Sequence, residues 1–281
     1  MEIPFIDAHC HLDRLFHLQG WRRSLGEYRA THPIPFPPGF RGAVSVWCDP
    51  PQFHTAPGIL ADQHELWAAF GVHPLQAPLW SLEVASQIEG YLDQLPQALA
   101  WGEMGLDYHG HRGPVDRPHQ RAVFRAQLRR AARRDVPVVI HCRDAETDLL
   151  QVMKEILPRD YPFHYHCVSV GPKLLTPVLE YFPHAKFGFT GLLSDPRRGG
   201  PVRESLRRIP LHRIVAETDA PYFPPSTLSR LPPRWRRSHP GMASEVVTAI
   251  ATIKKTPLAE VAARLLLNTQ AVYGMPLRGP G

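Results

Sequence analysis

The chain has 281 residues, and 43% of them are hydrophobic, which is enough to bury a large core. It contains no run of about 18 apolar residues, so we expect no membrane-spanning helix. A net charge of +6 favours a polyanionic partner such as nucleic acid. The N-terminus has no basic segment followed by an apolar one, and the four cysteines do not follow the pattern of a small disulfide-linked domain. We therefore expect no secretory signal and an intracellular, reducing location.

Apolar, strand-like runs alternate with helical patterns along the chain. The expected strands are Ile3–Ala8, Gly42–Cys48, Trp67–Val72, Ala98–Gly105, Pro137–His141, Pro162–Cys167, Lys186–Thr190 and His212–Glu217. The expected helices are Leu82–Leu95, Arg117–Arg134, Asp144–Leu157, Lys173–Tyr181, Val202–Arg208, Ala243–Ile253 and Leu258–Leu267. Proline-rich residues 31–40 and 221–240 are expected to be loops. Eight strands with intervening helices predict an α/β fold, a (β/α)8 barrel, as a single domain over residues 1–281.

Two histidines stand one residue apart at the end of the first apolar run. Successive side chains of a strand point to opposite faces, so His9 and His11 are expected on one side and Cys10 on the other. Two neutral imidazoles on one side of a strand end form a chelate for a divalent transition metal. Since the chain has 16 histidines, a chance pair on the surface is the alternative interpretation.

The other strand ends also carry residue types that bind metals or phosphate. These residues are His73, Glu103, His141 with Arg143, His166, and Glu217 with Asp219. In a (β/α)8 barrel the carboxyl ends of the strands meet at one mouth, where the chemistry takes place. An unpaired polar cluster buried there would be costly, so the convergence of these residues indicates a functional site rather than packing.

Five segments, in chain order, resemble the successive motifs of the TatD family of metal-dependent deoxyribonucleases, which are amidohydrolase-like barrels. These segments are Phe5–Asp13, Gly102–Tyr108, Pro137–Ala145, His166–Cys167 and Ile214–Tyr222. The segments that look most like the animal type-2 TatD-domain proteins are Trp47–Pro50, Gly188–Thr190 and Ser238–Gly241. Many members of the family have Asn-Glu-Pro where this chain has Ser238-His239-Pro240.

The resemblance implies two metal ions that share one bridging carboxylate, that of Glu103. The residues that match the ligands of the first metal are His9, His11, Glu103 and Asp219. Those that match the ligands of the second metal are Glu103, His141 and His166. His73 matches a residue that contacts the substrate phosphate.

Hydrolysis of a phosphodiester at neutral pH needs a strong nucleophile and neutralisation of the phosphoryl oxygens. Two metals roughly 3.5–4 Å apart supply both, because they acidify bound water to a pKa of about 7 and the metal-bound hydroxide then attacks. Each carboxylate oxygen of Glu103 can bind one ion. Asp219 can bind a metal and also accept the proton of the water. We expect Mg²⁺ or Mn²⁺ to support turnover, while four histidine ligands also suit Zn²⁺.

Three further residues near the strand ends have more than one interpretation. Glu217 shares the face of Asp219 and is an outer-sphere base, a ligand of a third ion or a residue that orients Asp219. Asp7 lies deeper than the histidine pair and is expected to support it without binding the metal. Arg143 shares the face of His141 and either clamps phosphate or forms a salt bridge at the rim.

The last loop carries the main cue for nucleic acid outside the metal site. Arg234, Trp235 and Arg236 follow the eighth strand, where arginines neutralise phosphates and an aromatic ring stacks on a base. A flexible, solvated loop is the alternative interpretation.

Three cysteines each neighbour a histidine of the ligand set. Strand alternation predicts that Cys10, Cys142 and Cys167 face the surrounding helices. We therefore expect them to pack as small hydrophobic side chains rather than to bind zinc.

Together these features predict a two-metal nuclease that hydrolyses phosphodiester bonds in DNA, and in RNA as a further substrate. Its expected activity is that of a 3′-end exonuclease or a repair-type enzyme in the nucleus or cytoplasm, acting on single-stranded or frayed DNA. The alternatives are an amidohydrolase that cleaves C–N or ester bonds, and a barrel that binds nucleic acid without turnover. Glu103 at the position where many amidohydrolases have a carbamylated lysine favours phosphate chemistry.

Overall fold

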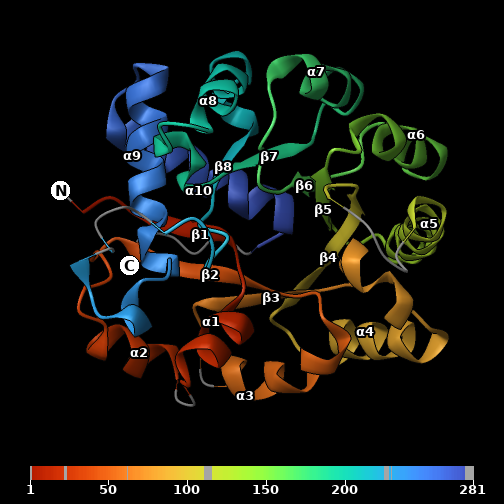
Figure 1. Ribbon diagram of the computed structural model, residues 1–281, viewed down its shortest axis with the longest axis horizontal. Helices are drawn as coiled ribbons and strands as arrows, with labels where there is room; N and C mark the ends of the chain where they lie inside the picture. Colours follow the sequence, from red (N-terminus) through yellow and green to blue (C-terminus); the bar gives the residue numbers. More distant parts are fainter. Residues whose placement is uncertain are drawn as a thin grey trace.

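The computed structural model describes residues 2–21, 24–61, 63–110, 116–224, 228 and 230–275. These residues form one sheet of eight parallel strands in the order β1 to β8, with helices around it (Figure 1). The strands are β1 (Phe5–Cys10), β2 (Phe40–Trp47), β3 (Leu66–Phe70), β4 (Ala98–Asp107), β5 (Val138–Arg143), β6 (Phe163–Tyr165), β7 (Lys186–Phe189) and β8 (Ile214–Ala216). The predicted (β/α)8 barrel is therefore confirmed.

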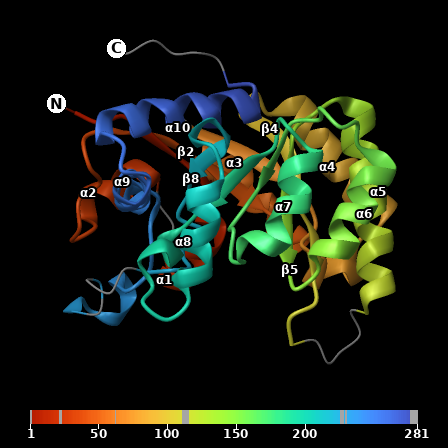
Figure 2. The same cartoon turned by 90° about the horizontal axis from the view of Figure 1, so that it is seen from above.

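Helices cover the outside of the strands, and α10 lies across one end of the barrel (Figure 2). The helices are α1 (Leu12–Gln19), α2 (Leu25–Thr31), α3 (Ala56–Leu60), α4 (Leu82–Gln94), α5 (Arg117–Arg134), α6 (Glu146–Ile156), α7 (Pro172–Tyr181), α8 (Gly199–Arg208), α9 (Ala243–Lys254) and α10 (Leu258–Tyr273). Short 3-10 helices occupy Pro50–Thr55, Pro74–Leu79, Gly191–Ser194, Leu211–Arg213, Pro233–Trp235 and Pro240–Met242. None of these described helices is both long and apolar enough to cross a membrane.

Backbone hydrogen bonds join the first strand to the segment that follows the last one. The amide of Asp219 donates to the carbonyl oxygen of His9 at 2.9 Å, and the amide of His11 donates to that of Ala220 at 2.7 Å. Cys10 and Ala220 form a parallel bridge at the same place. The barrel is thus closed beside the two histidines of the first strand.

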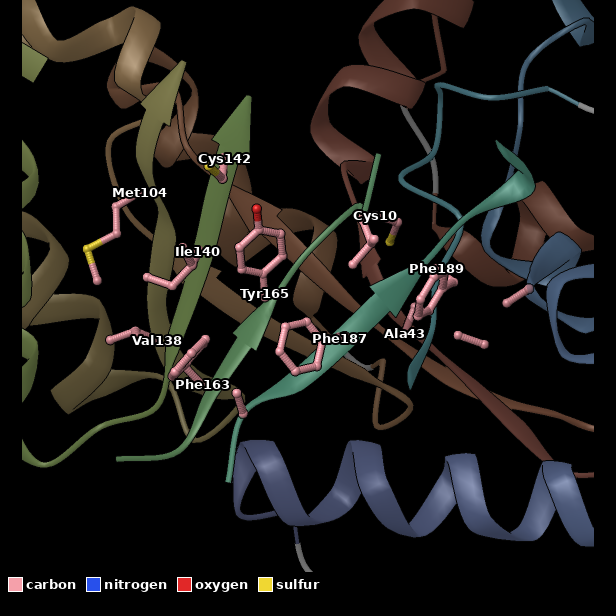
Figure 3. Packing of buried hydrophobic residues seen from close by; sticks show 14 of the residues in the cluster. Cys10, Ala43, Met104, Val138, Ile140, Cys142, Phe163, Tyr165, Phe187 and Phe189 are labelled. Atoms are coloured by element: carbon pink, nitrogen blue, oxygen red, sulfur yellow. The ribbon is translucent and has the colours of Figure 1, made fainter. Parts of the chain in front are cut away.

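The apolar core has two layers, as expected for parallel strands that are buried on both faces. The outer layer lies between strands and helices, and Figure 3 shows part of it, including Met104, Ile140 and Phe187. The inner layer fills the barrel with small and branched side chains such as Val44, Val46 and Val139, and α10 adds side chains to it. This packing leaves the carboxyl ends of the strands for polar residues.

All eight expected strands and all seven expected helices are present, most of them with ends shifted along the chain. α5 has the expected bounds, because the Asp116 side chain caps its first turn and Asp135 ends it in the left-handed conformation, with φ of 52°. The sequence did not predict α1, α2 or α3. They are short, so few apolar positions reveal their period; α3 has only five residues and follows a proline-rich 3-10 turn. The expected loop at 31–40 is confirmed from residue 32 to 39.

Candidate metal centre

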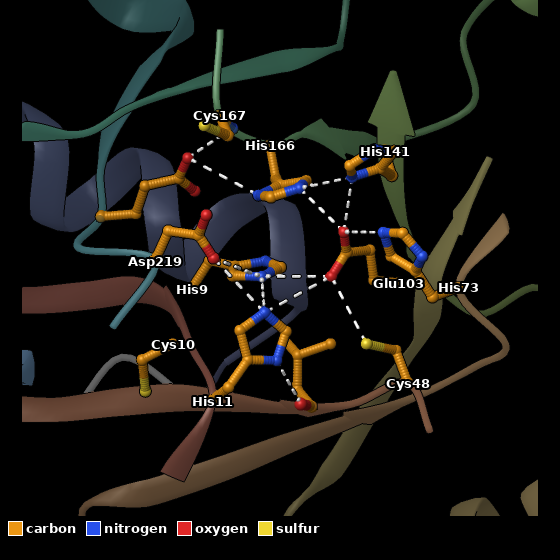
Figure 4. A network of polar contacts seen from close by, with 12 residues as sticks. His9, Cys10, His11, Cys48, His73, Glu103, His141, His166, Cys167 and Asp219 are labelled. Carbon is orange, nitrogen blue, oxygen red and sulfur yellow. Dashed lines mark hydrogen bonds and ion pairs between the residues drawn. The ribbon is translucent and has the colours of Figure 1, made fainter. Parts of the chain in front are cut away.

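Six buried or half-buried donors from the strand ends converge at the mouth of the barrel (Figure 4). They are His9, His11, Glu103, His141, His166 and Asp219. Barrel closure places Asp219 beside the first two histidines, as described above. His166 is placed by its amide, which donates to the carbonyl oxygen of Ile140 on β5 at 3.0 Å. The structure thus brings together all six residues that the sequence suggested as metal ligands.

Four of these donors form a compact group around Nε2 of His11. That atom lies 3.2 Å from Nε2 of His9, 3.5 Å from Oε2 of Glu103 and 3.3 Å from Oδ1 of Asp219. Nε2 of His9 lies 3.6 Å from the same oxygen of Glu103 and 3.7 Å from that of Asp219. Donors bound tetrahedrally at about 2.0–2.1 Å from a metal are roughly 3.4 Å apart. The group therefore fits a single divalent cation.

A second group forms around the other oxygen of Glu103. Its Oε1 lies 2.7 Å from Nδ1 of His141 and 3.0 Å from Nε2 of His166. These two nitrogens are 3.2 Å apart, and Nε2 of His73 lies 3.6 Å from the same oxygen. The two carboxylate oxygens of Glu103 therefore face two separate donor groups, each of which can hold a metal ion.

The charges of the cluster favour an ionised Glu103. Burial opposes ionisation, but interactions with His166, His141 and His9 outweigh it and hold the pKa of this carboxyl well below its ordinary range. Burial, with His166 nearby, lowers the pKa of His9 to about 3, so this imidazole is neutral and able to donate a lone pair to a metal. Oδ1 of Asp219 is buried without a hydrogen-bond partner, which a cation would supply.

Asp7 supports the site without belonging to either donor group, as expected. It is buried, and its Oδ1 accepts hydrogen bonds from the amides of Thr218 at 2.8 Å and His9 at 3.2 Å. The hydroxyl of Thr218 donates to its other oxygen. Asp7 therefore holds the segment after β8 against β1, where both strands present donors.

Glu217 lies at the inner edge of the cluster. Its Oε2 is 2.9 Å from Nε2 of His164, whose Nδ1 lies 2.7 Å from the hydroxyl of Tyr273. The amide of Cys167 donates to its Oε1, and a Cβ at Gly188 would collide with the carboxylate. Burial raises the pKa of Glu217 to about 8. These contacts hold the carboxyl in place, and together with His9 and His166 it forms a further group of donor atoms that could hold a metal ion.

The residues suggested as substrate contacts occupy different environments. His73 is half-buried, and its Nδ1 caps the Pro74–Leu79 turn while Nε2 faces Glu103. Arg143, Arg234 and Arg236 are exposed. The ring of Trp235 is half-buried, and its centroid lies 4.8 Å from that of His32. This ring therefore packs against the protein, whatever else it contacts.

Four residues of the cluster were missed by sequence reasoning, namely Arg14, Cys48, Asp107 and His164. Cys48 directly follows β2 and shares the face of Val44 and Val46, so strand alternation could have found it. Asp107 lies in the part of β4 beyond the predicted strand end, and its Oδ2 is 3.3 Å from Nε2 of His141. Arg14 lies on α1, which the sequence did not predict.

The expected packing of the three cysteines is correct for two of them. Cys10 and Cys142 belong to the outer hydrophobic layer and are labelled in Figure 3. The expectation is wrong for Cys167, which is half-buried, belongs to neither hydrophobic layer and has an amide that donates to Glu217. Strand alternation does not reach it, because β6 ends at Tyr165 and Cys167 has a φ of 49°.

The segment Ser238-His239-Pro240 is buried. Nδ1 of His239 accepts a hydrogen bond from the amide of Gly241 at 3.1 Å, which caps the Pro240–Met242 turn. The imidazole stacks on Phe36, with ring centroids 4.3 Å apart. In this chain the segment therefore has a structural role.

Comparison with protein families and sequences points in the same direction as the geometry. The model of the TatD-related DNase family matches residues 6–274. A human protein named 3′-5′ RNA nuclease TATDN2 is 39% identical over 281 residues, which cover 98% of this chain and 36% of that protein. A protein of Erwinia tasmaniensis named 3′-5′ ssDNA/RNA exonuclease TatD is 35% identical over 219 residues, or 77% of this chain and 82% of that protein. The chain thus spans about a third of the human relative's length.

Solved structures share the same fold. The TatD homologue YjjV from Escherichia coli superposes with a TM-score of 0.80 at 25% identity, over 98% of this chain and 100% of that one. A D-hydantoinase superposes with a TM-score of 0.56 at 12% identity, covering 98% of this chain and 71% of that one. This second likeness concerns the barrel alone.

Proposed function

Because the chain belongs to the family of TatD-related DNases, we propose that it is a divalent-metal-dependent nuclease that hydrolyses phosphodiester bonds of nucleic acid. The observation that carries the proposal is the position of Glu103 between two donor groups. One of its oxygens lies 3.5 Å from Nε2 of His11, and the other lies 2.7 Å from Nδ1 of His141. A carboxylate in this position can bridge two cations.

Two divalent cations are the proposed cofactors. The first would be held by His9, His11, Glu103 and Asp219, and the second by Glu103, His141 and His166. When bound, such ions neutralise phosphoryl oxygens and make water acidic enough to attack near neutral pH. Mg²⁺ or Mn²⁺ suits phosphate chemistry, and the imidazole-rich donor set also suits Zn²⁺.

The residues of the chain would divide the remaining work. The carboxylate of Asp219 is ionised, because interactions with His11, His166 and His9 outweigh burial and lower its pKa, and in this state it could take up the proton of the attacking water. Glu217 has its carboxyl fixed by Cys167 and orients the segment that carries Asp219. His73 contacts the phosphate from the side of the second donor group, with Arg143 at the rim.

Single-stranded nucleic acid cleaved from its 3′ end is the proposed substrate. The relatives of bacterial origin carry names that state this activity on DNA and RNA, and the human relative is named as a 3′-5′ nuclease of RNA. The basic residues Arg234 and Arg236 would neutralise backbone phosphates. We further predict a role in DNA repair and a location in the nucleus or cytoplasm. We also predict that residues 1–281 form one domain.

A substrate panel with defined metals tests the proposal. The purified chain is stripped with a chelator and reloaded with Mg²⁺, Mn²⁺ or Zn²⁺. It is then given 3′- and 5′-labelled single-stranded DNA, duplex DNA, abasic DNA and RNA. We expect single-nucleotide shortening of single strands from the 3′ end, lost with the chelator and restored by metal. Metal-loaded protein that binds these strands without cleaving them would contradict the proposal.

An amidohydrolase acting on C–N or ester bonds is the competing enzyme class. The barrel it would share with D-hydantoinase carries no information on chemistry. Glu103, rather than a lysine, stands at the position between the donor groups and favours the nuclease. Turnover of a cyclic amide or ester panel in the same reloaded samples, without cleavage of oligonucleotides, would favour the competitor.

A further inference from the structure

Cys48 faces the interior of the barrel mouth. It directly follows β2, and its neighbours at alternate positions, Val44 and Val46, belong to the same inner layer. Trp47, between Val46 and Cys48, lies in the outer layer with Cys10 and Cys142. Cys48 is 1% exposed, so its thiol is directed at the donor cluster rather than at solvent.

The contacts of this thiol are with the cluster itself. Its Sγ lies 3.6 Å from Oε2 of Glu103, to which it donates, and Figure 4 draws this contact. On the other side, the guanidinium of Arg14 donates to the sulfur at 3.7 Å and to the hydroxyl of Tyr222 at 2.8 Å. The donor atoms of Cys48, His11 and Glu103 all lie within 4.8 Å of one another.

These separations match the edges of a metal coordination shell. Cys48 would be a fifth donor beside the four of the first group, and zinc sites can be five-coordinate; two equatorial ligands, sulfur at about 2.3 Å and oxygen at about 2.0 Å, are then roughly 3.7 Å apart. The measured S···O separation is 3.6 Å, and the N···O separation between His11 and Glu103 is 3.5 Å. A second, independent feature also points to a cation here. Oδ1 of Asp219, which lies 3.3 Å from the same nitrogen of His11, is buried without a hydrogen-bond partner.

We propose that Cys48 is a sulfur donor at this metal centre and that it biases the centre toward a thiophilic cation such as Zn²⁺ over Mg²⁺. The inference rests on the proposed function, because it concerns the same centre. Thiolate sulfur is a soft ligand that prefers zinc, cobalt and cadmium, whereas magnesium prefers oxygen. Burial and the nearby Glu103 raise the pKa of the Cys48 thiol, so its proton leaves to solvent only as the metal binds, and the guanidinium of Arg14, 3.7 Å from the sulfur, partly offsets the negative charge that remains.

Cobalt and cadmium substitution tests the proposal directly. The full chain is stripped of metal and titrated with Co²⁺ or Cd²⁺, and near-ultraviolet absorption from thiolate-to-metal charge transfer is recorded. We expect this band in the wild type and in the control variant Cys142→Ser, and we expect its loss in Cys48→Ser. Competition with a chromophoric chelator should show Zn²⁺ binding weakened by roughly 10–100-fold in Cys48→Ser, the range for residues that tune a metal site. Mn²⁺ binding should change little.

The outcomes separate this inference from the proposed function. Stoichiometric cobalt without a charge-transfer band in the wild type overturns the sulfur donor, and oligonucleotide cleavage by the same sample leaves the nuclease intact. A band that persists in Cys48→Ser also overturns it. Failure of the wild type to bind any of these metals overturns both. The wild-type spectrum decides the question even if the Cys48→Ser variant does not fold.

Discussion

The amide of Asp219 donates a hydrogen bond to the carbonyl oxygen of His9 at 2.9 Å, and the same contact sets their side chains side by side, with Oδ1 3.7 Å from Nε2. The contact that closes the barrel therefore also sets the spacing of the first donor group. A substitution that loosens the closure should weaken metal binding even where the replaced residue contacts no metal.

Asp7→Asn tests this link. The amide oxygen of Asn can still accept from the Thr218 amide, but its NH2 group can only donate to the Thr218 hydroxyl, which already accepts from the amide of Ala220, so the hydroxyl proton loses its acceptor. Burial raises the pKa of Asp7 well above its ordinary range, so this bond is counted as one between neutral groups, and its loss should cost about 0.5–1.5 kcal/mol in the free energy of unfolding. Metal affinity, measured by competition, should fall as well. Phe163→Leu, in the outer layer, serves as a control that lowers stability alone. Equal metal affinity in Asp7→Asn and wild type would refute the coupling.

Glu103→Gln should abolish hydrolysis while the barrel stays folded. Gln keeps the size of the side chain but removes the charge that faces both donor groups. Removal of one electrostatic stabiliser typically costs about 10²–10³ in rate, and a bridging ligand should cost at least this much. Elemental analysis should show loss of bound metal, and circular dichroism should be unchanged. A variant with full metal content and near wild-type turnover would show that Glu103 does not bridge.

Asp107→Asn should weaken the second donor group specifically. Oδ2 of Asp107 lies 3.3 Å from Nε2 of His141, while Nδ1 of the same ring faces Glu103. A carboxylate behind a ligand histidine orients the ring and raises its basicity, and its removal costs roughly 10–100-fold in metal affinity. Isothermal titration of the stripped variant should therefore show one weakened and one unchanged metal. Two unchanged affinities would assign Asp107 a role in strand packing only.

Acid should destabilise the fold through His239. Burial, with His32 nearby, lowers the pKa of His239 well below its ordinary value of 6.5. Above pH 6.5 the imidazole is neutral in both states. Below that pH the unfolded chain binds a proton that the folded chain excludes, so stability falls by up to about 1.4 kcal/mol per pH unit for this group. Urea unfolding of the wild type and of His239→Asn between pH 5 and 8 measures the free energy of unfolding of each. This free energy should depend less steeply on pH in the variant. Asn can still cap the turn at Gly241. Identical slopes would remove His239 from the acid response.

The arginine loop should control substrate affinity through phosphate contacts. Replacing Arg234, Arg236 and Arg237 with Ala should raise KM for oligonucleotides and flatten its salt dependence by up to about three phosphate contacts. Turnover of a small phosphodiester should barely change. Arg207→Ala/Arg208→Ala on α8, which removes two exposed arginines paired with Glu204, is the matched control. An unchanged salt slope in the triple variant would leave substrate binding to the metal centre and its immediate neighbours.

Trp235 calls for a separate variant, because its ring packs against His32 and Tyr28. Trp235→Phe should retain most of this packing. If the ring also stacks on a base, Trp235→Ala, which removes the whole ring, should lose roughly 1–3 kcal/mol of oligonucleotide binding. A loss of thermal stability without a loss of binding would identify the ring as a packing residue alone.

The sequence by itself determined the architecture and most of the donor set. Period-2 and period-3.6 patterns are local, so the eight strands and the long helices could be predicted from neighbouring residues. Strand alternation is also local, and it correctly placed His9 and His11 on one side with Cys10 on the other. Since the ends of parallel strands in a barrel share one mouth, the donors could be expected to meet before any distance was known.

The tertiary structure alone decided how these donors divide and what surrounds them. The two oxygens of Glu103 face different groups only because the register of β4 against β5, and the closure of β1 against the segment after β8, fix their neighbours. Arg14, on the short helix α1, and Asp107, at the extended end of β4, also contact the cluster, and no local pattern predicted either element there. The structure also shows that His239 packs against Phe36 and that Cys48 contacts the donor cluster. The burial and orientation of these two side chains depend on segments distant in the chain.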